Sequence, residues 1–284
     1  MNIKMFYDQN TATFTYVVID EKTKKCAIID SVLDYDQFAG KTQTTSADTV
    51  ISYIEEHDLT NEWILETHVH ADHITAAHYL QSKIGGKIGI GAGIKKVLQT
   101  WVPIFEIEND VSVEGEQFDA LFDEGEIFYI GELKVTVWHT PGHTPACVSY
   151  LIDGNIFVGD TMFAPNLGTA RCDFPGGSAS LLFNTIQRFY TLPDETVVHL
   201  GHDYPAKGNA PLSSITIGQA KQENMQIKPD TKLEDYVARR EARDATLAVP
   251  KLLLPGLQAN LRNGQFEESK KSGLQFIKIP VNAL

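Results

Sequence analysis

The chain has 284 residues, of which 43% are hydrophobic and 21% charged, and these ordinary globular values exclude wholesale disorder. Its 24 Lys and Arg against 37 Asp and Glu give a net charge of −13, which repels nucleic-acid phosphates and anionic lipid. We therefore expect neither a nucleic acid nor a membrane as partner. Three cysteines cannot build a disulfide framework, and no apolar run is long enough for a signal peptide or a membrane span. These features predict a cytoplasmic protein.

The first half of the chain predicts strands followed by alternating strands and helices. Ser46 is placed to cap a helix, and Gly85-Gly86 to end a later one. The expected strands cover residues 14–20, 25–30, 63–66 and 87–91, and the expected helices cover 47–54, 74–84 and 94–101.

The second half begins with strands and ends with helices. Asp153-Gly154 is a strong two-residue hairpin signal, and Ser178 is placed to cap a helix. Thr231 and Glu234 have capping-box spacing for a last helix, which Pro250 stops. The expected strands cover residues 126–130, 133–139, 148–152, 155–158 and 196–200, the last of which is the last clear strand. This order predicts helices that cover stacked sheets.

The residues that carry chemistry gather in one segment. Of nine histidines in the chain, three lie with an aspartate in His68-Val69-His70-Ala71-Asp72-His73, between an expected strand and an expected helix. Taken singly, each histidine fits a structural, hydrogen-bonded role, and Asp72 fits a helix cap. Together they crowd ionisable groups at one turn, and imidazole and carboxylate are natural ligands of zinc, iron and manganese. The segment therefore predicts a metal site.

Three later residues, His143, Asp160 and His202, each come shortly after an expected strand. Because the hairpin turn at Asp153-Gly154 reverses the chain, Asp160 returns to the end of the sheet where His143 lies. We expect these groups to meet those of residues 68–73 at one rim of the sheets, on loops held by a rigid scaffold.

The order His-x-His-x-Asp-His, Gly-His-Thr, Gly-Asp and a last His after a strand resembles the signature of the metallo-beta-lactamase superfamily, over residues 13–205. The resemblance implies an α/β (α+β) fold, a four-layer αββα sandwich with the metal at one sheet edge. In two-metal members, the matching residues hold one metal through His68, His70 and His143 and the other through Asp72, His73 and His202, with Asp160 as bridge.

A narrower resemblance is to the persulfide dioxygenases. It rests on residues 67–75, 141–145, 168–174, 191–193 and 201–204, while residues 238–247 resemble the bacterial beta-lactamase-like branch found with sulfide-detoxification operons. The resemblance implies a single Fe(II) held by His68, His143 and Asp160, with His70, Asp72, His73 and His202 orienting these ligands. It also implies that O₂ oxidises a low-molecular-weight thiol persulfide, such as glutathione persulfide, to sulfite and free thiol. Gly-Thr-Ala-Arg-Cys-Asp replaces the Gly-x-Gly-Arg-Thr-Asp of the better-known branch, which leaves the thiol carrier open.

Two other functions fit the same residues. One is a dinuclear zinc hydrolase of the glyoxalase II type, in which a bridging hydroxide attacks a thioester carbonyl. The other is a metal-binding sensor or scaffold without turnover. The segment around Arg171 and the resemblance of the tail favour the dioxygenase over both.

In addition to their roles near the metal, we expect Asp72 and His73 to act in catalysis together with Tyr204, and Arg171 and Tyr204 to bind substrate. Arg171 suits a substrate carboxylate, or else it holds Asp173. Tyr204 donates to bound substrate, or else it packs. Cys172 is a carrier of sulfane sulfur or a small buried residue. We expect structural roles for four further histidines, His57, His78, His139 and His199.

The organisation of the chain follows from these assignments. Residues 1–205 form the expected metallo-beta-lactamase-like catalytic domain, and residues 206–284 a mainly helical extension packed on it. The apolar segment Leu252-Leu253-Leu254 with Leu257 suits packing on the body of the chain or on a second copy, as in a homodimer.

Overall fold

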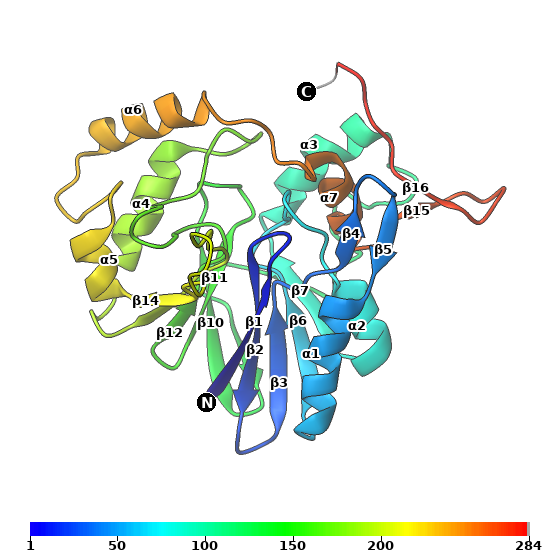
Figure 1. Cartoon of the computed structure of the whole chain (residues 1–284), viewed down its shortest axis with the longest axis horizontal. Coiled ribbons are helices and arrows are strands. Elements are labelled where there is room, and N and C mark those ends of the chain that lie inside the picture. The colour runs from blue at the N-terminus through cyan, green and yellow to red at the C-terminus, as the bar shows by residue number, and fades with distance from the viewer. Residues whose placement is uncertain (283–284) are drawn as a thin grey trace.

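A computed structural model describes residues 1–282, and it contains two stacked six-stranded sheets (Figure 1). The first sheet has the order β1 (Asn2–Asp8), β2 (Thr13–Asp20), β3 (Lys25–Ile29), β6 (Thr60–Leu65), β7 (Lys87–Gly91) and β8 (Ala120–Phe122). The second has the order β14 (Ser214–Thr216), β13 (Val197–His199), β12 (Asn155–Phe157), β11 (Val148–Ile152), β10 (Leu133–His139) and β9 (Ile127–Ile130).

Helices cover the outer face of each sheet (Figure 1). Those packed on the first sheet are α1 (Thr45–Glu56), α2 (Ala77–Ile84), α3 (Ile94–Phe105) and α7 (Leu253–Asn260). Those packed on the second are α4 (Ala179–Phe189), α5 (Ile217–Glu223) and α6 (Leu233–Asp244). A third apolar core, which includes Phe14, Leu65 and Tyr150, lies between the sheets. The expected αββα sandwich is confirmed.

Several local predictions hold. The chain reverses between β11 and β12 at Asp153-Gly154, and both residues have the positive φ angles that this short turn requires. Ser178 caps α4, because its hydroxyl accepts a hydrogen bond from the backbone N–H of Leu181. Leu182 and Ile186 then lie on the buried face of the helix.

Other local predictions are wrong, in most cases because the residue concerned has a different partner. Ser46 lies inside α1, and its hydroxyl donates to Asp34 instead of capping the helix. The helix expected from residue 74 begins at Ala77, because Ile74 pairs with Leu33 in an isolated β-bridge. Thr231 lies before the N-cap of α6, Lys232, and its hydroxyl accepts from the backbone of Lys228. That helix ends at Asp244, well before Pro250.

The C-terminal segment joins both halves of the sandwich. β14 lies beyond residues 196–200, the last strand that the sequence predicts, and it pairs antiparallel with β13 at the sheet edge. Leu253 and Leu257 on α7 pack into the first-sheet core of the same chain. Two short hairpins lie outside the two large sheets. One pairs β4 (Asp34–Asp36) with β5 (Lys41–Gln43), and the other pairs β15 (Glu267–Glu268) with β16 (Gln275–Phe276). The border expected at residue 205 stays a prediction.

Candidate metal centre

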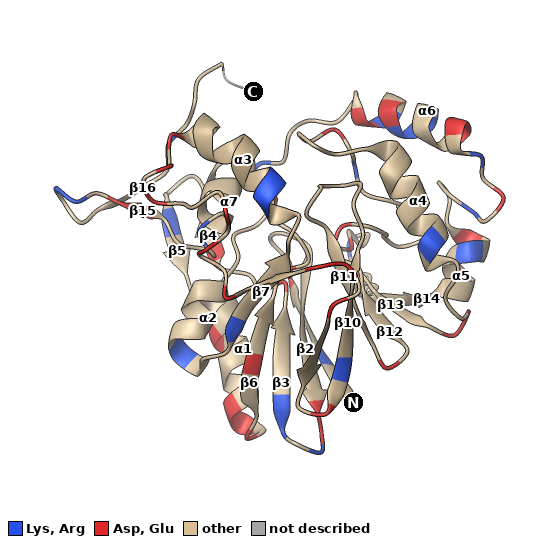
Figure 2. Ribbon diagram, turned by 180° about the vertical axis from the view of Figure 1, so that it is seen from behind, with Lys and Arg blue, Asp and Glu red and all other residues tan. Residues whose placement is uncertain are grey.

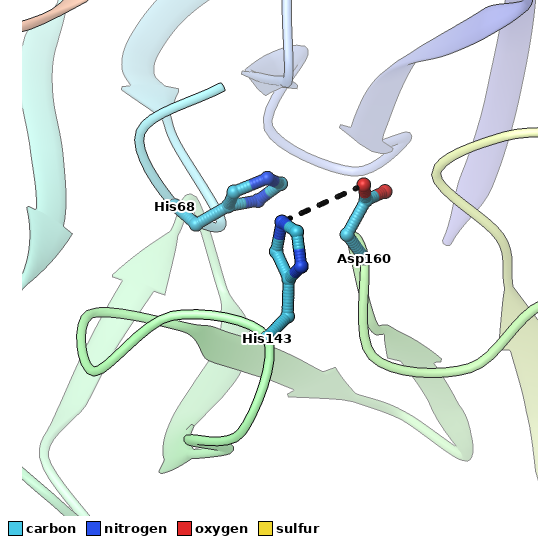
Figure 3. A group of neighbouring side chains, drawn as sticks. All are labelled: His68, His143 and Asp160. Carbon is cyan, nitrogen blue, oxygen red and sulfur yellow. Dashed lines mark ion pairs between the residues drawn. The ribbon is translucent and has the colours of Figure 1, made fainter. Parts of the chain in front are cut away.

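The loops that follow β6, β10, β12 and β13 meet at one rim of the two sheets. Ligand atoms of His68, His143 and Asp160 lie within 4.8 Å of one another, and the three side chains point toward a common centre (Figure 3). Asp160 Oδ2 lies 3.9 Å from His143 Nε2. His68 comes from the first sheet, whereas His143 and Asp160 come from the second. The structure thus brings these three residues together at one rim of the sheets, as the sequence predicts.

Glycines set the backbone before two of these residues. Gly142 has φ +150° and its Cα lies against the backbone of Leu182, so a side chain there would collide with α4. Gly159 has φ +49°, and a Cβ at this position would collide with Thr67. Only glycine accommodates both the positive φ angle and the close approach. The Gly-His and Gly-Asp pairs of the motif therefore place His143 and Asp160 at the rim.

The outward-facing nitrogens of the ligand histidines are fixed by hydrogen bonds. His143 Nδ1 donates to the carbonyl of Arg171 over 2.8 Å. Thr67 donates its hydroxyl proton to Asp30, so its oxygen accepts from His68 Nδ1 over 3.0 Å. Each arrangement leaves the Nε2 lone pair directed at the centre, the tautomer that a metal ligand needs.

A second group lies beside the first. Ligand atoms of His70, Asp72 and His73 also lie within 4.8 Å of one another. His202 Nε2 lies 3.2 Å from Asp72 Oδ2 and 3.3 Å from Asp160 Oδ1, between the two groups. Its Nδ1 donates to the carbonyl of Ala12, so two carboxylates face its remaining nitrogen. Such an arrangement requires a shared cation, either a proton or a metal.

A buried acidic pair holds His70. Its Nε2 lies 3.2 Å from Asp30 and 3.1 Å from Glu66, and all three side chains are buried. Burial alone would lower the pKa of His70, but these two carboxylates raise it well above its usual value. Nε2 therefore donates to these carboxylates, and Nδ1 is the ring nitrogen that can bind a metal in place of a proton.

Buried nitrogens test whether a metal fits. His68 Nε2, His70 Nδ1 and His73 Nε2 are buried without a hydrogen-bond partner among residues 1–282. Burial and the neighbouring His70 hold the pKa of His68 well below its usual value, so its ring is neutral. Three buried, unpartnered imidazole nitrogens beside carboxylates are costly unless a cation binds them. The residues therefore fit Fe(II) or Zn(II), either of which takes this donor set.

A residue of the C-terminal segment fixes the loop that carries His68–His73. Asn260, on α7, donates through Nδ2 to the carbonyls of His70 and His73, each over 2.8 Å. Its Oδ1 accepts from the backbone N–H of Thr75 over 2.8 Å. The side chain is 3% exposed, so these bonds are shielded from water.

A cavity of about 930 Å³ opens beside the centre. His143 and Asp160 line it, together with the β4–β5 hairpin, residues 163–174 and the C-terminal segment. The expected substrate residue Tyr204 lies in this wall, 59% exposed, with its ring parallel to that of His202. The size suits a small molecule or a short peptide.

Arg171 also lines the cavity, but its guanidinium is already paired. Nε and Nη2 each donate to Asp173 over 2.6 Å, and Nη1 donates to the carbonyl of Ala248 over 2.7 Å. The structure thus shows the alternative in which Arg171 holds Asp173. Its binding to a substrate carboxylate stays a prediction.

The remaining candidates have structural surroundings. Burial raises the pKa of Cys172 to about 12, and the same holds for Cys26 and Cys147, so none presents a thiolate near pH 7. His139 bonds the carbonyl of Phe122, and His199 bonds the side chain of Asn155.

Four residues of the site were not predicted as site residues from the sequence, namely Asp30, Glu66, Thr67 and Asn260. Glu66 and Thr67 directly precede the histidine cluster. Polar residues in that position could have been predicted to hydrogen-bond the ligand histidines. Asp30 directly follows β3 at the same rim, so the position after a strand was a signal for it too. Asn260 had no local signal, because its partners lie far away in sequence.

Within residues 1–282, no helix has both the length and the apolar character needed to cross a membrane. The sequence matches the family model of the metallo-beta-lactamase superfamily over residues 10–202. It is 46% identical to glyoxylase B2 of Dictyostelium discoideum, across 99% of this chain and 97% of that protein. It is 26% identical to human persulfide dioxygenase ETHE1, mitochondrial, across 71% of this chain and 68% of that protein.

The chain spans only 64% of the length of one bacterial relative, so some relatives are longer. Among solved structures, ETHE1 from Myxococcus xanthus superposes with a TM-score of 0.75 at 29% identity, over 93% of this chain and 100% of that one. The family model covers more than half of the chain, and the fold and the histidine–aspartate cluster agree with it. This chain belongs to the metallo-beta-lactamase superfamily.

Proposed function

We propose that the chain is an iron-dependent dioxygenase that oxidises a low-molecular-weight thiol persulfide to sulfite and the free thiol. The observation that carries the proposal is the group of His68, His143 and Asp160 at the edge of a cavity. Two imidazoles and one carboxylate on one face are typical of non-haem Fe(II) oxygenases. The likeness to proteins named persulfide dioxygenase and ETHE1 supports the same choice.

The overall reaction is RSSH + O₂ + H₂O → RSH + SO₃²⁻ + 2H⁺. The outer sulfur loses four electrons to O₂, the S–S bond breaks, and water supplies the third oxygen of sulfite. An Fe(II) bound here would supply open coordination positions for the persulfide sulfur and for O₂. Holding both reactants side by side removes much of the entropic cost of their meeting.

The chain's own residues have definable roles in this reaction. Thr67 and the Arg171 carbonyl hold the rings of His68 and His143 in the tautomer that binds metal. His202 Nε2, beside Asp72 and Asp160, can hold one of the protons that the reaction releases. Burial lowers the pKa of His202, but Asp160 and Asp72 raise it above its usual value, which favours the protonated ring. Tyr204 lines the cavity, and its proposed role is to donate a hydrogen bond to bound substrate.

A second candidate is a dinuclear metal hydrolase acting on a thioester. The observation that favours it is the second ligand group, His70, Asp72 and His73, with His202 between the groups. The relative named glyoxylase B2 points in the same direction. For this reaction, His68, His70 and His143 would hold one metal, Asp72, His73 and His202 would hold the other, and Asp160 would bridge them.

Protein purified without oxygen distinguishes the candidates. We expect about one iron per chain, O₂ uptake with glutathione persulfide, and one sulfite formed per O₂ consumed. The matched assay is hydrolysis of S-lactoylglutathione under the same conditions. About two zinc ions per chain with thioester hydrolysis and no O₂ uptake would establish the hydrolase instead. Absence of both activities in the metal-loaded protein would favour a sensor or scaffold.

A further inference from the structure

The wall of the cavity that the C-terminal segment forms carries a concentration of positive charge. Arg240 and Arg243 on α6 and Lys251 on the linker to α7 line it, with Arg171 beside them. Acidic and basic residues both occur along α6 (Figure 2), but of these only Arg240 and Arg243 line the cavity. In a chain of net charge −13, this cluster needs an explanation.

Two of these cations are neutralised inside the protein. Arg171 makes a two-bond pair with Asp173. Arg240 is buried, donates through Nε and Nη2 to Asp244, and donates through Nη1 to the carbonyl of Thr169. These bonds hold α6 against the segment of residues 169–173, and they give both guanidiniums partners inside the protein.

Arg243 and Lys251 differ from them. Within residues 1–282, neither side chain forms an ion pair or a hydrogen bond, and both are exposed where they line the cavity. The backbone that carries them is held in place, because Arg171 Nη1 donates to the carbonyl of Ala248 between them. A third cation, Lys41, lies on the opposite hairpin, where Asp36 is its partner in the β4–β5 register.

We propose that Arg243 and Lys251 form an anion subsite that binds the carboxylates of the thiol carrier while its reactive sulfur lies at the metal centre. The cavity is continuous from His143 and Asp160 to these two cations, and its volume of about 930 Å³ accommodates a peptide-sized thiol. The hairpin opposite carries Asp34 and Asp36, which repel a carboxylate and favour its placement at the C-terminal wall. The persulfide character of the carrier rests on the proposed function, whereas the charge selectivity of the subsite does not.

Two probes of nearly equal size test the subsite, glutathione with two carboxylates and glutathione diethyl ester with none. Binding of each to the metal-loaded protein is measured by calorimetry without oxygen. We expect Arg243→Ala and Lys251→Ala to weaken glutathione binding about fivefold each, and the double variant about 25-fold, as for solvent-accessible charge pairs. Arg243→Lys should retain most of the affinity. Arg239→Ala, an exposed arginine on the same helix that does not line the cavity, is the matched control and should bind as the unaltered protein does.

Binding of the diethyl ester should change less than twofold in every variant, and added salt should narrow the difference between the probes. Equal weakening of both probes, or unchanged glutathione binding in the double variant, would overturn the subsite. Selective loss of glutathione binding in a protein that consumes no O₂ with glutathione persulfide would support the subsite and overturn only the dioxygenase proposal.

Discussion

At the scale of single residues, replacing different histidines of the centre should have different effects on iron content and activity. We expect His143→Ala to lose bound iron and O₂ uptake, because it removes one of three ligands. His70→Ala should retain iron and lose about 10- to 100-fold in activity, as is typical when a supporting hydrogen-bonded group is removed. The iron content per chain and the rate of O₂ uptake are measured for both variants. Full iron content and full rate in His143→Ala would contradict the assignment, and so would a crystal structure with two metals bonded to His70 and His202.

A histidine away from the centre should control stability at acidic pH. Burial lowers the pKa of His199 to about 4, below the value of about 6.5 in an unfolded chain. The unfolded state therefore takes up this proton first, and the stability due to the neutral ring is complete above about pH 6.5 and lost as the pH falls toward 4. Between pH 7 and 4.5, this loss should be about 2–3 kcal/mol.

The measurement compares urea unfolding of metal-free protein with that of His199→Gln, which keeps a side chain able to bond Asn155. All other titrating groups are shared, so their effects cancel in the difference. The variant should lose less stability than the unaltered protein over this pH range. Equal losses in both proteins would show that His199 does not titrate as its burial implies.

At the scale of elements, α7 acts on the metal loop through one side chain. We expect Asn260→Asp to weaken metal binding about 10- to 100-fold, because the carboxylate still accepts from Thr75 but cannot donate to the carbonyls of His70 and His73. Gln258→Ala is the control on the same helix, since Gln258 is buried but bonds Lys278 instead. Both variants should lose stability in urea, whereas only Asn260→Asp should lose metal affinity. Equal metal affinity in the two variants would exclude a positioning role for Asn260.

The elements also show where sequence patterns succeed. Ser178 caps α4 as expected, because nothing else competes for its hydroxyl except Ser180 two residues away. Ser46 is also a serine beside a run of residues with helical periodicity, yet its hydroxyl donates to Asp34 of a separate hairpin, and the residue lies inside α1. The ligand positions were predictable because each lies in the loop that follows a strand, and these loops share one rim. The bonds from Asn260 were not, because periodicity and motif spacing carry no information about a partner 185 or more residues away.

At the scale of the whole molecule, the metal centre joins the two halves of the sandwich. His68 belongs to the first sheet and His143 to the second, so a bound metal links them in the folded state only. We expect removal of the metal by a chelator to lower the free energy of unfolding by about 2.7 kcal/mol for metal present at 100 times its Kd. Thermal unfolding with and without chelator measures this. The same chelator should have no effect on Asp160→Ala, and an equal effect there would show that it acts elsewhere.

The burial of all three cysteines has a consequence for self-modification. A persulfide passes its outer sulfur to any accessible thiolate, and the rate follows the fraction of thiol that is ionised. With pKa values of about 12, that fraction at pH 7 is on the order of one in 10⁵ for Cys26, Cys147 and Cys172. A protein that handles persulfides in this cavity would therefore emerge from many turnovers with its own mass unchanged.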